Sequence, residues 1–182
     1  MEKPKLIIVE GCPAVGKSSV TNLLREKLVN TTLFRLSSIK HDRNCAVYSY
    51  HSSLLLYLFD MRFYGMNCVM DRSFLSQYVY ARLGYKDHTF ERETDMLLKR
   101  LNILAQSYDI HFILLVANKS DFEQRLMRDK AQYVEHSVEN SMKQQNEYLK
   151  VFDEIETNFE KHIINNSGLT ADQTADLILS YL

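Results

Sequence analysis

The sequence predicts an α/β fold with three layers, in which helices cover both faces of a five-stranded parallel sheet. Short apolar runs that have the length of strands recur along the chain, and longer periodic segments separate them. Only five glycines and two prolines occur among 182 residues, so most of the chain is expected in regular structure. Strands that alternate with helices pair in parallel through right-handed crossovers. A chain of this length and pattern is expected to form a single domain, residues 1–182.

Five segments are predicted to be strands because they are short, apolar and bounded by polar residues. They are residues 6–10, 32–36, 67–71, 110–116 and 162–165. The first run is apolar at nearly every position, as a central strand of a parallel sheet should be. It is therefore expected in the middle of the sheet.

The segments between and after these strands are predicted to be helices. They are residues 17–29, 49–64, 74–83, 89–107, 137–158 and 170–182. In the first, Val20, Leu23, Leu24 and Leu28 are spaced to share one helical face. The second is rich in leucine, and the last opens with the capping-box spacing of Thr-Ala-Asp-Gln at 170–173.

Bulk composition excludes several classes of protein. Lys and Arg number 22 and Asp and Glu 23, so no global charge favours a nucleic-acid or membrane partner. No apolar run has the length of a membrane span, and no signal pattern opens the chain. Cys12, Cys45 and Cys68 are scattered without metal or disulfide spacing. The expectation is a cytoplasmic protein with unreactive thiols.

A phosphate-binding motif follows the first strand. The stretch Gly11-Cys12-Pro13-Ala14-Val15-Gly16-Lys17-Ser18 fits G-x-x-x-x-G-K-[ST]. Such a P-loop wraps a polyphosphate with backbone N–H groups, and the helix behind it offers its positive N-terminus. Lys17 would place a charge at the β- and γ-phosphates, and Ser18 a hydroxyl on Mg²⁺. We therefore expect residues 11–19, Ser19 included, to bind ATP.

A second constellation follows the third strand, where Asp71 and Arg72 stand at its carboxyl end. A carboxylate there would hold Mg²⁺ directly or through water. The guanidinium beside it would bind a phosphate with two parallel hydrogen bonds, which a lysine cannot do. Both residues are predicted to be catalytic, and Asp71 also to be a metal ligand.

Three segments resemble the P-loop nucleotide kinases of the thymidylate kinase and deoxynucleoside kinase superfamily, and the order of expected elements is similar along almost the whole chain. They are the Asp71-Arg72-x-x-x-Ser76-x-x-x-Tyr80 pattern, Glu10-Gly11 before the P-loop, and a Leu-rich helix that ends at Arg62. The resemblance implies a nucleotide kinase-like P-loop NTPase with a helical lid. It further implies that an acceptor nucleotide lies near Arg72, Tyr80 and Arg62. Arg35 is a further candidate to hold the acceptor, and Tyr57, Phe59 or Phe63 are candidates to stack on its base.

The chain combines features of both families. Asp71 is the choice of thymidylate kinases, whereas Ser73 is the choice of nucleoside kinases. Residues 37–43, after the second strand, fit neither family. Both a monophosphate and a nucleoside therefore stay open as the acceptor.

A lid is expected over residues 120–136. Arg125 and Arg128 lie three positions apart and would share a helical face. Similar lid arginines stabilise the charge that spreads onto the equatorial oxygens during phosphoryl transfer. Positions 12–15 carry no basic residue, so the P-loop cannot supply this arginine itself.

Several functions compete. The first is ATP- and Mg²⁺-dependent phosphoryl transfer to a deoxynucleoside monophosphate, as in thymidylate kinases. The second is a deoxynucleoside kinase, which needs Asp71 or Asp42 as a base for the 5′-hydroxyl. The third is a regulatory NTP-binding switch that signals by shape. Asn-Lys-Ser-Asp at 118–121 matches the base reader of switch GTPases, but no D-x-x-G element occurs, so the match is interpreted as a coincidence at the start of the lid. The fourth, a kinase acting on DNA, is disfavoured by the near-neutral charge. A homodimer is implied only by the resemblance.

Overall fold

The computed structural model describes residues 3–36, 44–86, 89–128 and 136–182. Its sheet has five parallel strands in the order β2-β3-β1-β4-β5. The strands are β1 (Lys5–Glu10), β2 (Thr31–Arg35), β3 (Asn67–Asp71), β4 (Asp109–Val116) and β5 (Glu160–Asn165). All five expected strands are confirmed, with bounds that differ by no more than two residues.

The central position of β1 is confirmed as well. Ile7 pairs with Val69 of β3 on one side and with His111 of β4 on the other. The side chains of residues 6–9 are at most 1% exposed, because helices cover the sheet above and below them. The apolar run that marked this strand in the sequence is thus explained by burial on both faces.

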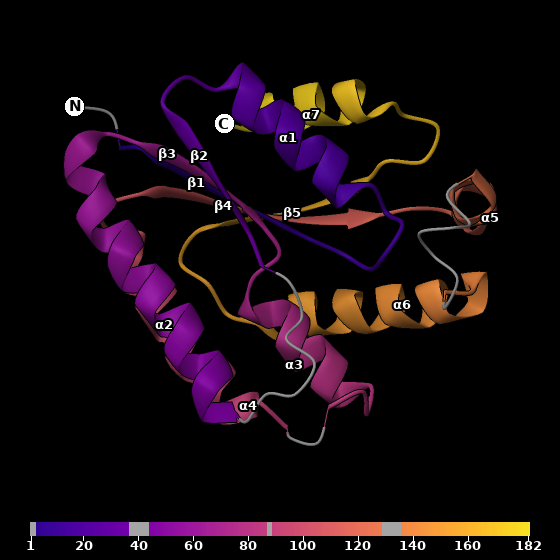
Figure 1. The fold of residues 1–182 in the computed structure, drawn as a ribbon, viewed down its shortest axis with the longest axis horizontal. Helices are drawn as coiled ribbons and strands as arrows, with labels where there is room; N and C mark the ends of the chain where they lie inside the picture. The colour runs from indigo at the N-terminus through magenta and orange to yellow at the C-terminus, as the bar shows by residue number, and fades with distance from the viewer. Residues whose placement is uncertain (1–2, 37–43, 87–88, 129–135) are drawn as a thin grey trace.

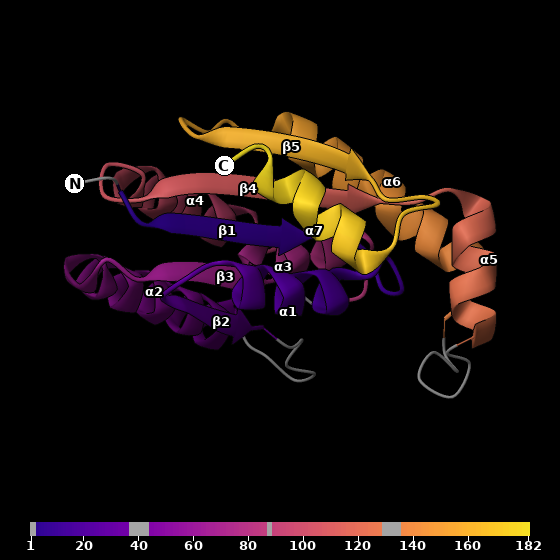
Figure 2. The ribbon, with the colours of Figure 1, turned by 90° about the horizontal axis from the view of Figure 1, so that it is seen from above.

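The helices divide between the two faces of the sheet (Figures 1 and 2). They are α1 (Lys17–Lys27), α2 (Asn44–Met61), the 3₁₀ helix η1 (Arg62–Tyr64), α3 (Phe74–Arg82), α4 (Glu91–Leu104), α5 (Lys119–Arg128), α6 (Val138–Glu154) and α7 (Ala171–Leu179). Helices α1 and α7 cover one face, and α2, α3, α4 and α6 cover the other. The fold is therefore the expected three-layer α/β architecture.

Right-handed crossovers explain this division. The step from β1 to β2 runs in one direction across the sheet, and the steps from β2 to β3, β3 to β4 and β4 to β5 run in the opposite direction. Hence β1 leads into α1 on one face, while β3 leads into α3 on the other. A crevice opens at the carboxyl ends of β1 and β3, where ligands bind in sheets of this kind.

The starts of two helices can be compared with the expectation. Helix α2 begins at Asn44, five residues before the predicted start. Helix α7 begins behind Thr170, whose side chain accepts from Gln173 while Gln173 reaches back, so the predicted capping box is confirmed. Within the described ranges no helix has the length and apolarity to cross a membrane. Within the same ranges no three His, Cys, Asp or Glu side chains gather as metal ligands do.

Candidate active site

The P-loop joins β1 to α1 at the carboxyl edge of the sheet, and its glycines are required by geometry. Gly11 has φ 142°, and a Cβ added there would lie 2.7 Å from the Leu115 carbonyl oxygen. Gly16 has φ 97° directly before the first turn of α1. These left-handed positions bend the loop so that its backbone curls around the N-terminus of the helix.

Lys17 is buried at the mouth of this loop. Its ammonium donates to the Cys12 carbonyl oxygen at 2.6 Å, and the residue is only 5% exposed. Burial, helped by the nearby positive charge of Arg72, lowers the pKa of Lys17 to about 7. A bound phosphate would supply the anion that this ammonium lacks in the free protein.

Cys12 itself is buried, and burial raises the pKa of its thiol to about 11. Cys68 is buried in the same way, with its pKa also raised to about 11. Both thiols are therefore protonated near neutral pH, as expected, since a thiol reacts through its thiolate. The side chain of Cys45 lies outside the described residues.

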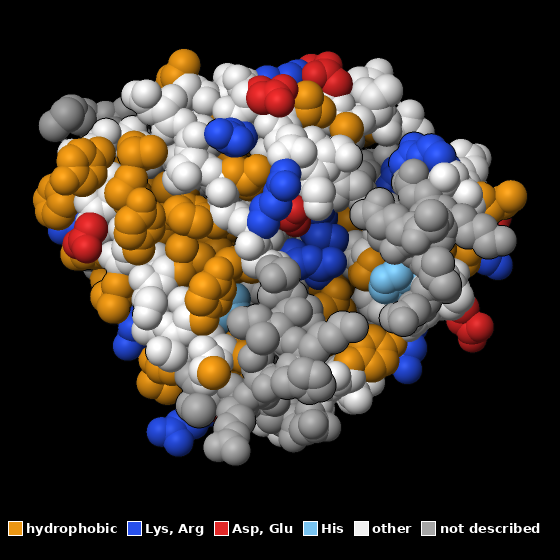
Figure 3. Space-filling model, viewed as in Figure 1, with side chains coloured by type: hydrophobic (Ala, Val, Ile, Leu, Met, Phe, Trp, Pro, Cys, Tyr) orange, Lys and Arg blue, Asp and Glu red, His pale blue; other side chains and the backbone are white. Residues whose placement is uncertain are grey.

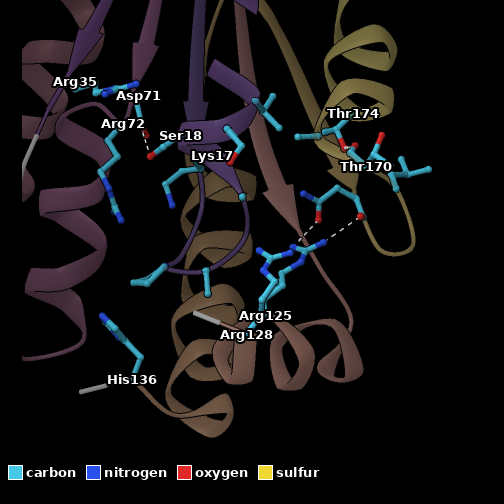
Figure 4. Close-up of a pocket in the computed structure, with 18 of the residues that line it drawn as sticks. Lys17, Ser18, Arg35, Asp71, Arg72, Arg125, Arg128, His136, Thr170 and Thr174 are labelled. Carbon is cyan, nitrogen blue, oxygen red and sulfur yellow. Dashed lines mark hydrogen bonds between the residues drawn. The ribbon is translucent and has the colours of Figure 1, made fainter. Parts of the chain in front are cut away.

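Ser18 and Asp71 meet across the crevice. The Ser18 hydroxyl donates to Asp71 Oδ2 at 2.7 Å, from the start of α1 to the end of β3 (Figure 4). Adjacent oxygen ligands of an octahedral Mg²⁺ lie about 2.9 Å apart, given metal–oxygen distances of about 2.0–2.1 Å. A hydroxyl and a carboxylate at this separation fit a magnesium site.

Arg72 occupies a strained turn between β3 and α3. Its φ is 76°, and its backbone N–H donates to the Val9 carbonyl oxygen at 3.0 Å. Its Nη1 donates to the hydroxyl of Tyr80 at 2.8 Å. Longer contacts join Nη1 to Ser76 Oγ at 3.4 Å and to the Tyr148 hydroxyl at 3.5 Å. The guanidinium thus donates these hydrogen bonds to neutral hydroxyl oxygens.

Glu10 lies beneath this turn and is fully buried. Its Oε1 accepts from the backbone N–H of Ser73 at 2.6 Å and from the Ser73 hydroxyl at 2.7 Å. Its Oε2 accepts from the Ser76 hydroxyl at 2.7 Å. Burial raises the pKa of Glu10, against the effect of these hydrogen bonds and of the Arg72 charge, which lower it.

Helix α5, the described part of the expected lid, bonds to the P-loop. Arg125 Nη1 donates to the Val15 carbonyl oxygen at 3.0 Å and to Asn166 Oδ1 at 3.2 Å. Asn166 Nδ2 donates to the same Val15 oxygen at 2.7 Å. Helix α5, the loop after β5 and the P-loop are thereby joined by hydrogen bonds (Figure 4). Residues 129–135 of the expected lid lie outside the described residues.

A cavity of about 850 Å³ lies at the carboxyl edge of the sheet. Its described lining includes five cations and one carboxylate, namely Lys17, Arg35, Arg72, Arg125, Arg128 and Asp71. Lys and Arg side chains gather at the middle of the face shown in Figure 3, over this cavity. Such an excess of positive charge, in a crevice with a P-loop, suits a polyphosphate.

The structure does not bring Tyr57, Phe59 and Arg62 to the cavity. Tyr57 packs edge-on against Phe34 of β2, with ring centroids 5.8 Å apart. The Arg62 guanidinium lies 3.4 Å from the centre of the Phe59 ring. Helix α2 carries the chain from the carboxyl edge of β2 back to the amino edge of β3, so its last turns lie at the opposite edge from the P-loop (Figure 1). Their predicted contact with an acceptor is therefore corrected.

Residues of the Asn-Lys-Ser-Asp stretch at 118–121 form hydrogen bonds with the end of β5 and the loop after it. Asp121 Oδ1 accepts from the Gly168 N–H at 3.1 Å and lies 3.6 Å from Arg125 Nη2. Asn118 Oδ1 accepts from Asn165 Nδ2 at 3.4 Å. A guanine reader needs its carboxylate turned to the base, whereas Asp121 binds backbone and arginine. This geometry argues against the guanine-dependent switch.

Three residues of the site went unassigned in the sequence analysis. Glu10 appeared only as part of a resemblance, although an acid that ends an apolar strand is itself a signal. Asn166 stands next to another asparagine in a loop for which no side chain was assigned. Tyr148 lies on α6, more than seventy positions from Arg72 along the chain, and no local pattern pointed to it. Asp42 and the rest of residues 37–43 lie outside the described residues.

No family model and no curated protein sequence matches the chain. Solved structures resemble it over nearly its full length. The tunicamycin resistance protein of Deinococcus radiodurans has a TM-score of 0.57 at 18% identity, covering 98% of this chain and 95% of that chain. The deoxyadenosine kinase of M. mycoides with bound dCTP has 0.58 at 18%, covering 97% of each. The thymidylate kinase of Candida albicans has 0.54 at 16%, covering 98% and 91%. The chain therefore has the fold of the P-loop kinases.

Proposed function

We propose that the protein is a phosphotransferase that moves the γ-phosphoryl group of ATP, with Mg²⁺, to a deoxynucleoside monophosphate. Three features support a phosphotransferase: the P-loop kinase fold, the complete P-loop motif, and the cavity with five cations and one carboxylate. The thymidylate kinase and the deoxyadenosine kinase among the similar structures name the two acceptor types to be distinguished.

On the donor side, residues 11–19 would wrap the phosphates of ATP with their backbone N–H groups. Lys17 would leave the Cys12 carbonyl and bind the β- and γ-phosphates. Ser18 and Asp71 would hold Mg²⁺, which when bound bridges phosphate oxygens and neutralises their charge. Asn165, Asn166 and the loop after them would border the adenine.

On the acceptor side, one observation favours a monophosphate. Asp71 is the only carboxylate among the described residues that line the cavity, and it is bonded to Ser18 in the metal position. A 5′-hydroxyl acceptor needs a carboxylate to take its proton, whereas a phosphate acceptor is already ionised. Arg72, with Tyr80 and Arg35 nearby, would bind the acceptor phosphate.

The two lid arginines take different parts in this proposal. Arg125 is engaged with the P-loop backbone and Asn166, so it shapes the donor site. Arg128 lines the cavity one turn further along α5 and would stabilise charge on the equatorial oxygens of the transferring group.

The test is ADP release from ATP and Mg²⁺ over a panel of deoxynucleosides and deoxynucleoside monophosphates, with Lys17→Met protein and acceptor-free reactions as blanks. Turnover with a monophosphate such as dTMP is the expected result. Turnover with nucleosides alone would replace the proposal by the deoxynucleoside kinase, with Asp42 as the residue to substitute next. Release at the blank rate with every acceptor would reject both.

A further inference from the structure

Two consecutive residues of β1 hold the turn that carries Arg72. Val9 accepts the N–H of Arg72, and the Glu10 carboxylate accepts the N–H of Ser73. The peptide groups on either side of Arg72 are thus both fixed to the strand that leads into the P-loop. A left-handed backbone is strained at an arginine and persists only where the surrounding structure over-determines it. Glu10 therefore helps to fix the position from which the Arg72 side chain extends.

The hydrogen bonds around Glu10 also have a direction. Three donated hydrogen bonds and the nearby charge of Arg72 favour the ionised form of Glu10 against the effect of burial. An ionised carboxylate only accepts, so the hydroxyl hydrogens of Ser73 and Ser76 both point toward Glu10. Ser76 Oγ lies 2.8 Å from the Tyr148 hydroxyl, and its own hydrogen is already engaged. Tyr148 must therefore donate to Ser76. The lone pairs of Tyr148 are then left for Arg72 Nη1, 3.5 Å away.

We propose that ionised Glu10 is a positioning residue, which sets the polarity of a relay through Ser76 and Tyr148 so that only acceptor oxygens face the guanidinium of Arg72. The relay joins β1, α3 and α6 and ends at the residue assigned to the acceptor phosphate. This inference rests on the proposed function, in which Arg72 binds the acceptor phosphate. It adds Glu10 as a residue that acts through Arg72 without contacting the substrate.

A purely structural role would not call for a carboxylate here. A fully buried charge is costly, and well-packed apolar residues of similar volume often serve stability as well or better. Helix α3 already has its N-cap, because Ser73 Oγ accepts from the Leu75 N–H at 3.2 Å. The charge of Glu10 fixes the direction in which the Ser73 and Ser76 hydroxyl groups donate, and it places an anion near Arg72.

Glu10→Gln reverses the relay without changing its shape. The amide oxygen must take the place of Oε1, since the backbone N–H of Ser73 can only donate to it. The amide NH₂ then faces Ser76 and donates to it, Ser76 donates to Tyr148, and the Tyr148 hydrogen turns toward the guanidinium. We expect the KM for the acceptor dTMP to rise about tenfold, with the KM for ATP within twofold of wild type.

A double-mutant cycle with Tyr148→Phe isolates the relay. Phenylalanine has no hydroxyl to turn. The double variant is therefore expected to have a KM for dTMP within twofold of that of Tyr148→Phe alone. Equal fold-changes in both backgrounds would overturn the relay. Equal rises in the KM of dTMP and ATP, together with a lowered Tm, would reduce Glu10 to a structural residue. Glu26→Gln on the exposed side of α1 is the matched control.

A second measurement needs no turnover and therefore separates this inference from the proposed function. The Nε–Hε signal of Arg72 in ¹⁵N spectra of the ligand-free protein is assigned by its loss in Arg72→Lys. We expect it to be sharp in wild type, Glu26→Gln and Tyr148→Phe, and broadened in Glu10→Gln. An unchanged signal in Glu10→Gln would overturn the proposal even if dTMP is a substrate. A broadened signal in a protein that does not phosphorylate dTMP would support the relay and reject the acceptor.

Discussion

The proposed donor and acceptor halves of the cavity are built in opposite ways. The donor half is one continuous stretch, residues 11–19, whose shape follows from two glycines and the start of a helix. The acceptor half gathers around Arg72, which depends on Glu10 of β1, Tyr80 of α3 and Tyr148 of α6. A local motif can be recognised from its letters, whereas a site assembled by packing depends on contacts between distant segments.

The largest expected effect tests the donor half. Lys17→Met removes the charge that the P-loop brings to the β- and γ-phosphates, and kcat is expected to fall about 10³-fold, near 4 kcal/mol. The Tm of the ligand-free protein should not fall, because the lost ammonium is buried beside Arg72. Steady-state rates and calorimetry check both expectations. A matching loss of rate in Lys27→Met, on the same helix, would contradict the assignment.

The next prediction concerns stability on the acceptor side of the sheet. His51 of α2 is 3% exposed and packs edge-on against Phe74 of α3, and burial lowers its pKa from 6.5 to about 4. Between these values the unfolded chain binds more protons, so the free energy of unfolding should fall by about 3 kcal/mol from pH 6.5 to 4 through this group. Urea titrations of wild type and His51→Gln give the difference, and parallel pH curves for the two would rule the effect out.

The acceptor half is tested directly by Arg72→Lys. Lysine keeps the charge but loses the planar pair of donors, so the KM for the acceptor should rise roughly 30-fold while that for ATP stays within threefold. Arg82→Lys, at the end of helix α3 and paired with Glu147 and Glu154 at the surface, is the control and should leave both constants unchanged. A rise in the ATP constant instead would move Arg72 to the donor half.

A smaller effect is expected where the lid meets the donor half. Arg125→Ala removes the bonds to Val15 and Asn166, so the KM for ATP should rise about tenfold, and the acceptor constant should hold. Glu123→Ala, an exposed position on α5, is the control. If kcat fell strongly while the KM for ATP did not change, Arg125 would be a transition-state group and not a support of the P-loop.

The smallest effect should come from the far end of α2. Arg62→Ala is expected to change every kinetic constant less than twofold, because Arg62 lies against Phe59 and Phe63 at the amino edge of the sheet. Steady-state kinetics with the same acceptor panel make the comparison. A tenfold loss of acceptor affinity would return Arg62 to the site.

The sequence predicted most of the architecture because strand and helix periodicities are local. Five strands and the helices between them were expected at positions that differ little from the structure, and the early start of α2 at Asn44 is the main difference. The same locality explains why Arg62 was misplaced. The family pattern that singled out Arg62 did not indicate in which direction α2 crosses the sheet, and this direction decides at which edge Arg62 lies.

By itself, the sequence determined the α/β class, the P-loop and the pairing of an acid with an arginine after β3, because backbone preferences and burial patterns act over a few residues. Only the tertiary structure decided that Ser18 meets Asp71, that Asn166 and Arg125 hold the P-loop, and that Glu10, Ser76 and Tyr148 surround Arg72. The physical reason is that hydrogen-bond partners are chosen by how strands and helices pack. A hydrogen bond between residues that are distant along the chain produces no periodic pattern in the sequence.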